Sequence, residues 1–233
     1  MQKPIKKIAI LQSNYIPWKG YFDLINMVDE FILYDDAQYT KNDWRNRNLI
    51  KTRNGLEWLT IPVFFKGRSA QKIHEAVVSD PRWGKQHWRT ITQNYSKAPY
   101  LNEYKSVLEP LYCDNREDRL SRINFMFIKT ICGILGVNTK ISWSMDYALT
   151  GDRNERLIGL CKTTHATHYV SGPAAKDYID DGLFKKEGID LSYIDYSGYP
   201  EYAQMFGGFE HGVSIIDLIF NEGPNATKYM KSF

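Results

Sequence analysis

Short continuous runs of apolar residues alternate with amphipathic stretches along the first part of the chain. KKIAIL (residues 6–11) and EFILY (Glu30–Tyr34) are apolar enough for strands that are buried on both faces. Between them, KGYFDLINMV (residues 19–28) carries apolar side chains at close to a helical spacing. A strand, a helix and a strand within about 30 residues predict a parallel pair joined by a right-handed crossover.

A hairpin and a helical segment are predicted after this first unit. Asn54-Gly55 lies between two runs rich in β-formers, NLIKT and LEWLTIPV, and this pattern predicts an antiparallel hairpin. Residues 81–135 have helical spacing, and their last helix is expected to end before Gly136. The later stretches predict strands within 139–145, 167–172 and 191–196, and helices within 154–165 and 212–223.

These elements predict an α/β fold: a mainly parallel sheet with an antiparallel hairpin and an inserted helical segment at about residues 81–135. The chain has no internal repeat, linker or low-complexity tract. We therefore expect residues 1–233 to form a single domain.

The composition is that of an ordinary globular protein, with 24% charged and 43% hydrophobic residues. A net charge of +3 indicates neither binding to a nucleic acid duplex nor attraction to a membrane surface. The apolar runs are too short for membrane insertion, and the beginning of the chain is not typical of a signal peptide. Three widely spaced cysteines, Cys113, Cys132 and Cys161, favour reduced thiols and a cytoplasmic location. The sequence gives no prediction of oligomeric state.

Polar and aromatic side chains follow three of the predicted strands, in the segments Gln12–Lys19, Asp35–Tyr39 and Ser171–Tyr178. In the last of these, Ser171 or Gly172 is expected to cap a helix that begins near residue 173. Ligands of open α/β sheets bind outside the carboxyl ends of the strands. We therefore predict that the three segments surround one small-molecule cavity.

The segment Asp35–Lys51 is the richest in polar and aromatic residues. On an extended chain Arg45 and Arg47 share one face, which suits bidentate capture of a phosphate or carboxylate. A solvated ribbon with ordinary ion pairs is the alternative interpretation. The combination of Trp, Tyr and Asn in the same segment favours a binding role.

Candidate residues follow from these segments. We expect the substrate to contact Gln12, Asn14, Tyr15, Trp18, Tyr21, Gln38, Tyr39, Trp44, Arg45, Asn46, Arg47, Asn48, Lys51, Ser171, Gly172 and Tyr178. Asp35 or His87 is the candidate proton acceptor, and Lys19 is a candidate for stabilising an oxyanion. The histidines lack the spacing of metal ligands, so no metal site is predicted.

Several common catalytic motifs are missing from the sequence. It contains no G-x-S-x-G, no G-x-x-x-x-G-K-[ST] and no G-x-G-x-x-G after the first strand, which disfavours hydrolase triads, P-loop chemistry and dinucleotide binding. The Pro-x-x-Gly after the first strand is loosely similar to nucleotidyltransferases that bind ATP there. Those enzymes have paired histidines where this chain has Trp18 and Lys19.

Six blocks of the sequence resemble, in order, those of the WbqC-like family: LQSNYIPWKGYFDLI, DDAQYTKNDWRNRNLIKT, EWLTIPV, HWRTITQNYSKAPY, ERLIGLCKTTHATHYVSGPAAKDY and GVSIIDLIFNEG. One difference is Gln12-Ser13, where the family commonly has Gln-Pro. Members occur among bacterial genes for O-antigen and other surface polysaccharides, and glycine transfer has been suggested for some of them. The resemblance implies a nucleotide-linked sugar as substrate and supplies no settled catalytic residues.

The leading hypothesis is a transferase that acylates, or glycylates, an amino group on a nucleotide-activated sugar. The sugar amine would attack an activated acyl or aminoacyl donor directly, and no other cofactor is predicted. Two alternatives remain: a non-catalytic protein that binds sugar nucleotides or glycans and assists a neighbouring transferase, and an ATP-using enzyme of the nucleotidyltransferase type.

Overall fold

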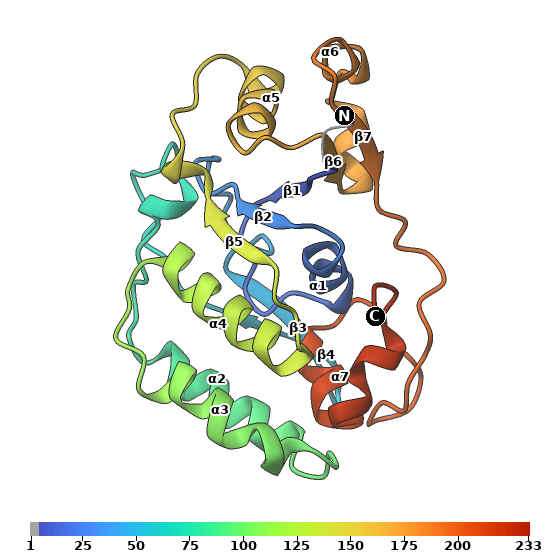
Figure 1. Ribbon diagram of the computed structural model, residues 1–233. Coiled ribbons are helices and arrows are strands. Elements are labelled where there is room, and N and C mark those ends of the chain that lie inside the picture. The colour runs from blue at the N-terminus through green and yellow to red at the C-terminus, as the bar shows by residue number, and fades with distance from the viewer. Residues whose placement is uncertain (1–4) are drawn as a thin grey trace.

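The computed structural model describes residues 5–233, and its centre is a five-stranded sheet in which all neighbouring strands are parallel (Figure 1). The strand order is β5-β2-β1-β6-β7. These strands are β1 (Lys7–Leu11), β2 (Glu30–Leu33), β5 (Lys140–Trp143), β6 (His168–Ser171) and β7 (Asp190–Tyr193). A separate antiparallel hairpin is made of β3 (Arg47–Thr52) and β4 (Gly55–Thr60). The predicted α/β class, with a parallel sheet and a hairpin, is confirmed.

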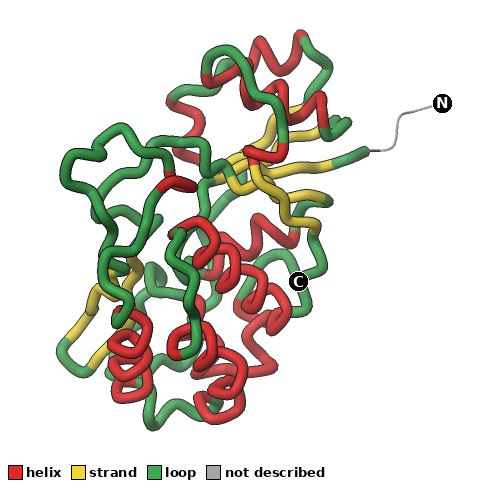
Figure 2. The backbone as a smooth tube through the Cα atoms, turned by 90° about the vertical axis from the view of Figure 1, so that its left-hand side faces the viewer, coloured by secondary structure: helices red, strands yellow, loops and turns green. Residues whose placement is uncertain are grey.

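Helices cover both faces of this sheet, because alternate residues of a strand point to opposite sides. The helices of the chain are α1 (Lys19–Asn26), α2 (Trp83–Asn94), α3 (Leu101–Cys113), α4 (Leu120–Leu135), α5 (Arg153–Thr163), α6 (Asp181–Lys186) and α7 (Ile215–Glu222), of which α2 and α3 pack against α4 and the hairpin and not on the sheet. Ala9 of β1 packs in the hydrophobic cluster that contains α1, α4 and α7, whereas Ile8 and Ile10 pack in the cluster that contains α5 and α6. Figure 2 shows helices on both sides of the strands.

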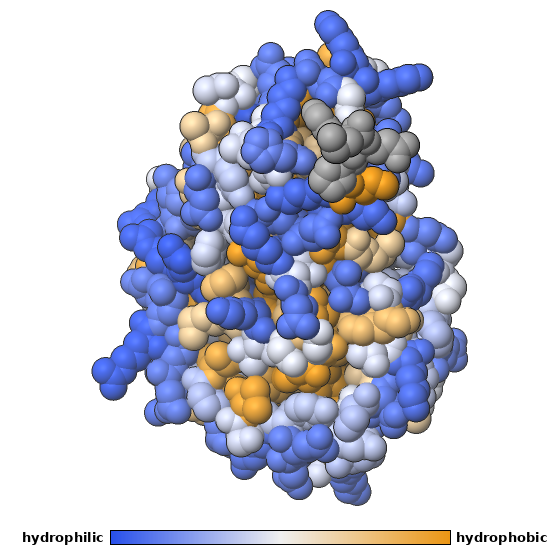
Figure 3. Space-filling view, in the orientation of Figure 1, coloured by the Kyte–Doolittle hydropathy of each residue, from blue (hydrophilic) through white to orange (hydrophobic). Residues whose placement is uncertain are grey.

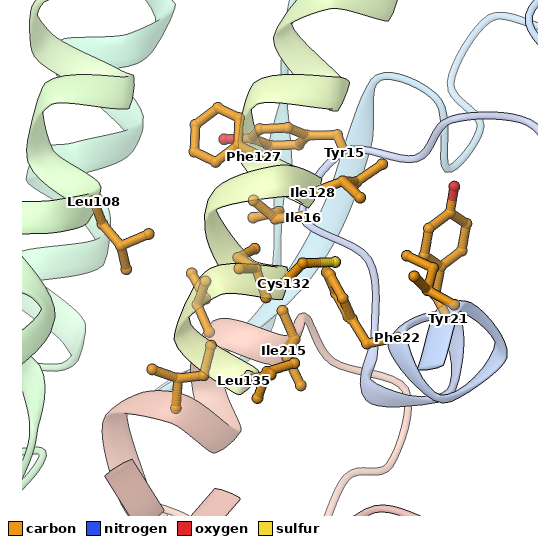
Figure 4. Close-up of a cluster of buried hydrophobic side chains, with 14 of the residues drawn as sticks. Tyr15, Ile16, Tyr21, Phe22, Leu108, Phe127, Ile128, Cys132, Leu135 and Ile215 are labelled. Atoms are coloured by element: carbon orange, nitrogen blue, oxygen red, sulfur yellow. The ribbon is translucent and has the colours of Figure 1, made fainter. Parts of the chain in front are cut away.

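The larger hydrophobic cluster joins the loop after β1 to the inserted helices. Tyr15 and Ile16 of this loop lie beside Phe127 and Ile128 of α4, as Figure 4 shows. The ring centroids of Tyr15 and Phe127 are 5.5 Å apart in an edge-to-face arrangement. The packing of the helical segment therefore fixes the course of the loop where the sequence places its first candidate residues.

The chain reverses its direction across the sheet beside β1. From β1 it moves outward to β2 and β5, and it then returns to form β6 on the other side of β1. After β1 the chain continues into α1 on one face, and after β6 it continues into α6 on the other face. Such a topological switch point opens a crevice at the carboxyl ends of the two strands.

The hairpin loop lies one residue earlier than its sequence signal. Thr52 pairs with Gly55, so the loop is Arg53-Asn54 and Gly55 is the first residue of β4. Gly55 has a φ of 104°, which side chains rarely adopt, and this conformation explains the need for glycine there. The hairpin itself is confirmed.

The region after β6 departs further from the prediction. Gly172 caps only a 3₁₀ turn, Pro173–Asp177, and not the expected helix. Helix α6 was not expected, because its six residues are too few to show a helical period. By contrast, the three helices of the inserted segment are present, and α4 is closed by Gly136 at a φ of 75°.

The surface seen in Figure 3 is mostly hydrophilic, with hydrophobic patches in its lower half where Figure 1 shows α4 and α7. Of the helices described for residues 5–233, none has the length and apolar character that a membrane crossing needs. All three cysteines are free thiols.

Candidate functional site

A cavity of about 280 Å³ lies at the switch point, and we call it the switch-point cavity. It is lined by Ile10, Leu11, Gln12, Tyr34, Ala37, Arg153, Leu157, Tyr169 and Tyr178. These residues come from the carboxyl ends of β1 and β2, from β6, from the first two turns of α5 and from the turn after β6. The predicted location of a ligand site, outside the carboxyl ends of parallel strands, is where this cavity lies.

The lining of the switch-point cavity combines phenol rings with two polar groups. The Arg153 guanidinium carbon lies 4.5 Å from the ring centroid of Tyr178, a cation–π contact that orders an otherwise exposed side chain. Gln12 accepts a hydrogen bond from Arg45 through its Oε1. The amide nitrogen of Gln12 has no partner among residues 5–233 and can donate to a ligand.

A second cavity, of about 340 Å³, lies beside the loop after β1, and we call it the aromatic cavity. It is lined by Asn14, Pro17, Trp18, Trp44, Asn48, Tyr196, His211 and Gly212. The ring of Trp18 meets that of Tyr196 edge to face, with centroids 5.0 Å apart. Gly20 makes room for Trp18, because a Cβ at Gly20 would stand 2.3 Å from the indole ring.

The loop after β1 contributes residues to both cavities. Gln12 lines the first and Asn14 the second, so their Cα atoms are at most about 7 Å apart. Trp44 lines the second cavity, and its neighbour Arg45 bonds to Gln12. The candidate residues that line a cavity are thus divided between two cavities, where the sequence predicts one.

Asp35, a candidate proton acceptor, is completely buried. Its Oδ1 accepts a hydrogen bond of 2.8 Å from the backbone N–H of Ser13, and its Oδ2 accepts one from the Ser121 hydroxyl. Burial raises the pKa of Asp35 against the opposing effect of these hydrogen bonds. The carboxyl group therefore ties the loop after β1 to α4, and it faces neither cavity.

His87, the other candidate, is also part of the packing. Its Nδ1 lies 2.9 Å from the Tyr15 hydroxyl, and its Nε2 lies 3.2 Å from the carbonyl oxygen of Thr60. Burial lowers the pKa of His87 to about 4, so the ring is neutral at pH 7. Both ring nitrogens are engaged, and the residue joins α2 to the hairpin and the first loop.

Lys19 lies in a cage of aromatic rings from the segment between β7 and α7, residues 194–214. Its Nζ donates to the carbonyl oxygen of Pro200 at 2.9 Å and lies 5.0 to 5.7 Å from the ring centroids of Tyr199, Tyr202 and Phe209. Burial lowers its pKa to about 8. Lys19 holds this segment, which also contributes residues to the aromatic cavity, in place.

The candidate residues of the hairpin have structural partners. The Asn48 amide donates to the carbonyl oxygens of Tyr15 and Ile16, at 3.0 Å each, and so fixes the loop after β1. The Arg47 guanidinium carbon lies 4.0 Å from the ring centroid of Trp58. Arg45 and Arg47 therefore do not act as a pair: Arg45 points to Gln12 and Arg47 stacks on the hairpin.

The candidate residues can be grouped by the cavity that they line. Gln12 and Tyr178 line the switch-point cavity, and Asn14, Trp18, Trp44 and Asn48 line the aromatic cavity. Lining neither cavity are the buried Tyr15, Lys19, Tyr21, Asp35, Tyr39, Asn46, Lys51, His87 and Ser171, the partly buried Arg45, Arg47 and Gly172, and the exposed Gln38.

Five polar or aromatic residues that line the cavities were not among the candidates: Tyr34, Arg153, Tyr169, Tyr196 and His211. For Arg153 a signal exists in the sequence, because Asp152 and Glu155 form a capping box that marks the start of α5. Tyr196 and His211 lie in a long irregular segment, whose position depends on contacts with Lys19, a residue distant in the sequence. Among residues 5–233, no group of three or more His, Cys, Asp and Glu side chains could hold a metal ion.

Comparison with known proteins identifies the family. The family model described as "WbqC-like protein family" matches residues 12–229, which include most of the lining of both cavities. The chain belongs to the WbqC-like family. The family resemblance seen in the sequence blocks is thereby confirmed.

A relative of this WbqC-like protein is found in Mycobacterium tuberculosis, where it is named only as an uncharacterized protein. The two are 50% identical over 227 residues, which make up 97% of this chain and 98% of the relative. No solved structure matches the chain.

Proposed function

We propose that this WbqC-like protein transfers an acyl group, such as glycyl, to an amino group of a nucleotide-linked sugar. The observation that supports the proposal is the pair of cavities lined by Gln12 and by Asn14, which are two residues apart in the chain. A transfer reaction between two substrates needs two sites whose reacting ends meet, because much of the rate comes from holding the reactants together. The sugar nucleotide belongs in the switch-point cavity and the acyl donor in the aromatic cavity.

The reaction is a direct attack of the sugar amine on the carbonyl carbon of an activated ester or thioester. The new C–N bond forms as a tetrahedral intermediate, which collapses with loss of the donor's oxygen or sulfur leaving group. The amine loses a proton in this process, and we assign His211 to accept it and to pass it to the leaving group. His211 is the histidine in the lining of the aromatic cavity.

Asn14 is a suitable positioning residue for the amine. It lines the aromatic cavity, and its Oδ1 is buried without a hydrogen-bond donor among residues 5–233. A buried acceptor without a donor is costly, and an N–H group of the substrate would satisfy it after a small local shift. The assignment replaces Asp35 and His87, whose polar atoms are used within the fold.

The burial of Asp35 and His87 also favours a second candidate, a protein that binds sugar nucleotides without chemistry. One assay separates the two functions. The full chain is incubated with UDP- and dTDP-linked amino sugars together with acyl and aminoacyl donors, and the sugar masses are measured. A mass increase of one acyl group supports transfer. Unchanged masses together with ligand binding by calorimetry support the binding protein, and the absence of both contradicts both functions.

His211→Gln is expected to lower kcat for acyl transfer about 100-fold with little change in KM, because it removes the proton acceptor and leaves the cavity walls in place. The matched control is His165→Asn, at an exposed histidine after α5 whose φ of 57° an asparagine tolerates. Steady-state kinetics of both variants make the comparison. Equal kcat values for His211→Gln and the parent protein would remove His211 from the mechanism.

A further inference from the structure

We propose that Arg153 and Arg156 bind the diphosphate of a nucleoside diphosphate whose base lies against Tyr34 and Tyr178. This inference rests on the proposed function and names the part of the substrate that the switch-point cavity holds. It adds a phosphate site made by the first turn of α5. Neither arginine belongs to a segment that the sequence marked as a binding site.

A second hollow lies near the switch-point cavity, because neighbouring residues of the same two segments line the two spaces. This open hollow, of about 370 Å³, is lined by Asp36, Lys72, His74, Met145, Tyr147, Leu149 and Arg156. Ala37 lines the switch-point cavity and its neighbour Asp36 lines the hollow. On α5, Arg153 and Arg156 are three residues apart, so their side chains project from the same side of the helix, one to each space.

The volume of the switch-point cavity indicates which part of a nucleotide it can hold. A cavity of about 280 Å³ is at the lower limit of ordinary ligand sites, which suits a single ring system better than a whole nucleotide. Tyr34 and Tyr178 offer the ring faces, and Leu157 adds an apolar surface. The phosphates of a bound nucleotide would then lie over the first turn of α5, between the cavity and the open hollow, and the sugar attached to them would turn back toward Gln12.

The positive charges of Arg153 and Arg156 are not neutralised by acidic side chains in the part of the chain that the structure describes. Neither Arg153 nor Arg156 forms an ion pair with any residue from 5 to 233, whereas the acidic groups nearby are engaged. Asp36 accepts from Lys72 at 2.8 Å, and Asp152 and Glu155 are used in the capping box of α5. Two guanidinium groups without an acidic partner, one helical turn apart, suit the spacing of two phosphate groups and can each bind in a bidentate way.

The remaining polar groups of the hollow strengthen this assignment. His74 directs its Nδ1 to the carbonyl oxygen of Asp35 at 3.0 Å, which fixes the ring at the edge of the hollow. Lys72 balances the charge of Asp36, so this carboxylate does not repel an incoming anion as an isolated one would. The net charge offered to the ligand is therefore the positive charge of the two arginines.

The test is calorimetric binding of UDP, UMP and uridine to the full chain, with dTDP as a second diphosphate. Arg156→Ala is expected to weaken UDP binding about tenfold and to leave uridine binding unchanged, because only the phosphate contact is lost. Arg153→Ala should weaken UDP binding by a similar factor. Tyr178→Leu should weaken uridine and UDP alike, because it removes a ring face that both use.

Arg89→Ala is the matched control, since Arg89 is an exposed arginine of α2 that lines neither cavity. It should bind UDP as the parent protein does. Unchanged UDP affinity in the double variant of Arg153 and Arg156, or no binding of UDP and dTDP by the parent protein, would overturn the inference. Arginine-dependent binding without acyl transfer would support the phosphate site and contradict only the transfer reaction.

Discussion

Asp35→Ala is expected to lower the free energy of unfolding by about 3–5 kcal/mol, while Asp35→Asn costs much less. The alanine variant leaves the Ser13 N–H and the Ser121 hydroxyl without their acceptor inside a fully buried site. An asparagine keeps an oxygen for Ser13 and places an amide group beside Ser121. The two substitutions therefore separate a structural carboxyl group from a catalytic one.

Urea denaturation of the two variants gives the stabilities, and the transfer assay gives their turnover. If Asp35 is structural, Asp35→Asn keeps its turnover per folded molecule. A folded Asp35→Asn variant without turnover would return Asp35 to the role of proton acceptor that the sequence first suggested.

Glu30→Gln is expected to cost about 3 kcal/mol of stability at pH 7. Glu30 begins β2 with its carboxylate almost fully buried, and four side chains bond to it: Lys6, Lys140, Ser142 and Tyr147. Although burial alone would raise its pKa, these hydrogen bonds lower the pKa from 4.5 to about 2. At about 1.4 kcal/mol per pKa unit, the ionised form contributes about 3 kcal/mol.

The pH dependence of this contribution has a definite sign. The pKa of Glu30 is lower in the folded protein, so the stabilisation is complete above about pH 4.5 and is lost as the pH falls toward 2. Urea denaturation between pH 7 and pH 3 should show a steeper loss of stability in the parent protein than in Glu30→Gln. Glu57→Gln, at an exposed position of β4, is the control. Parallel pH profiles of Glu30→Gln and the parent protein would contradict this account.

Much of the fold could be predicted from local patterns in the sequence. The apolar run before Gln12, the helical spacing after Lys19 and the Asn54-Gly55 signal each lie within one element, and each element formed as expected. The order of the strands depends on how long connections cross the sheet, which local spacing does not record. The position of α5 beside the end of β1 follows from this order, so Arg153 was not linked to Gln12 in advance.

The candidate site could be predicted only in part, because burial and distant partners are not recorded in local sequence. Residue type identified Trp18 and Trp44 as cavity residues, because aromatic side chains in a polar loop are typical of binding surfaces. Residue type also favoured Asp35 and His87, whose roles are decided by burial and by partners on α4 and the hairpin. Sequence spacing gives no measure of burial, so it does not distinguish a residue that lines a cavity from one that is buried in the fold.

The most direct measurement of the central claim is a crystal structure of the full chain with a UDP-linked amino sugar. Our account predicts that the base lies against Tyr34 and Tyr178, that the diphosphate contacts Arg153 and Arg156, and that the sugar amine lies about 3 Å from Asn14 Oδ1. Density for the ligand on any other face, or a switch-point cavity that stays empty at saturating ligand, would contradict it.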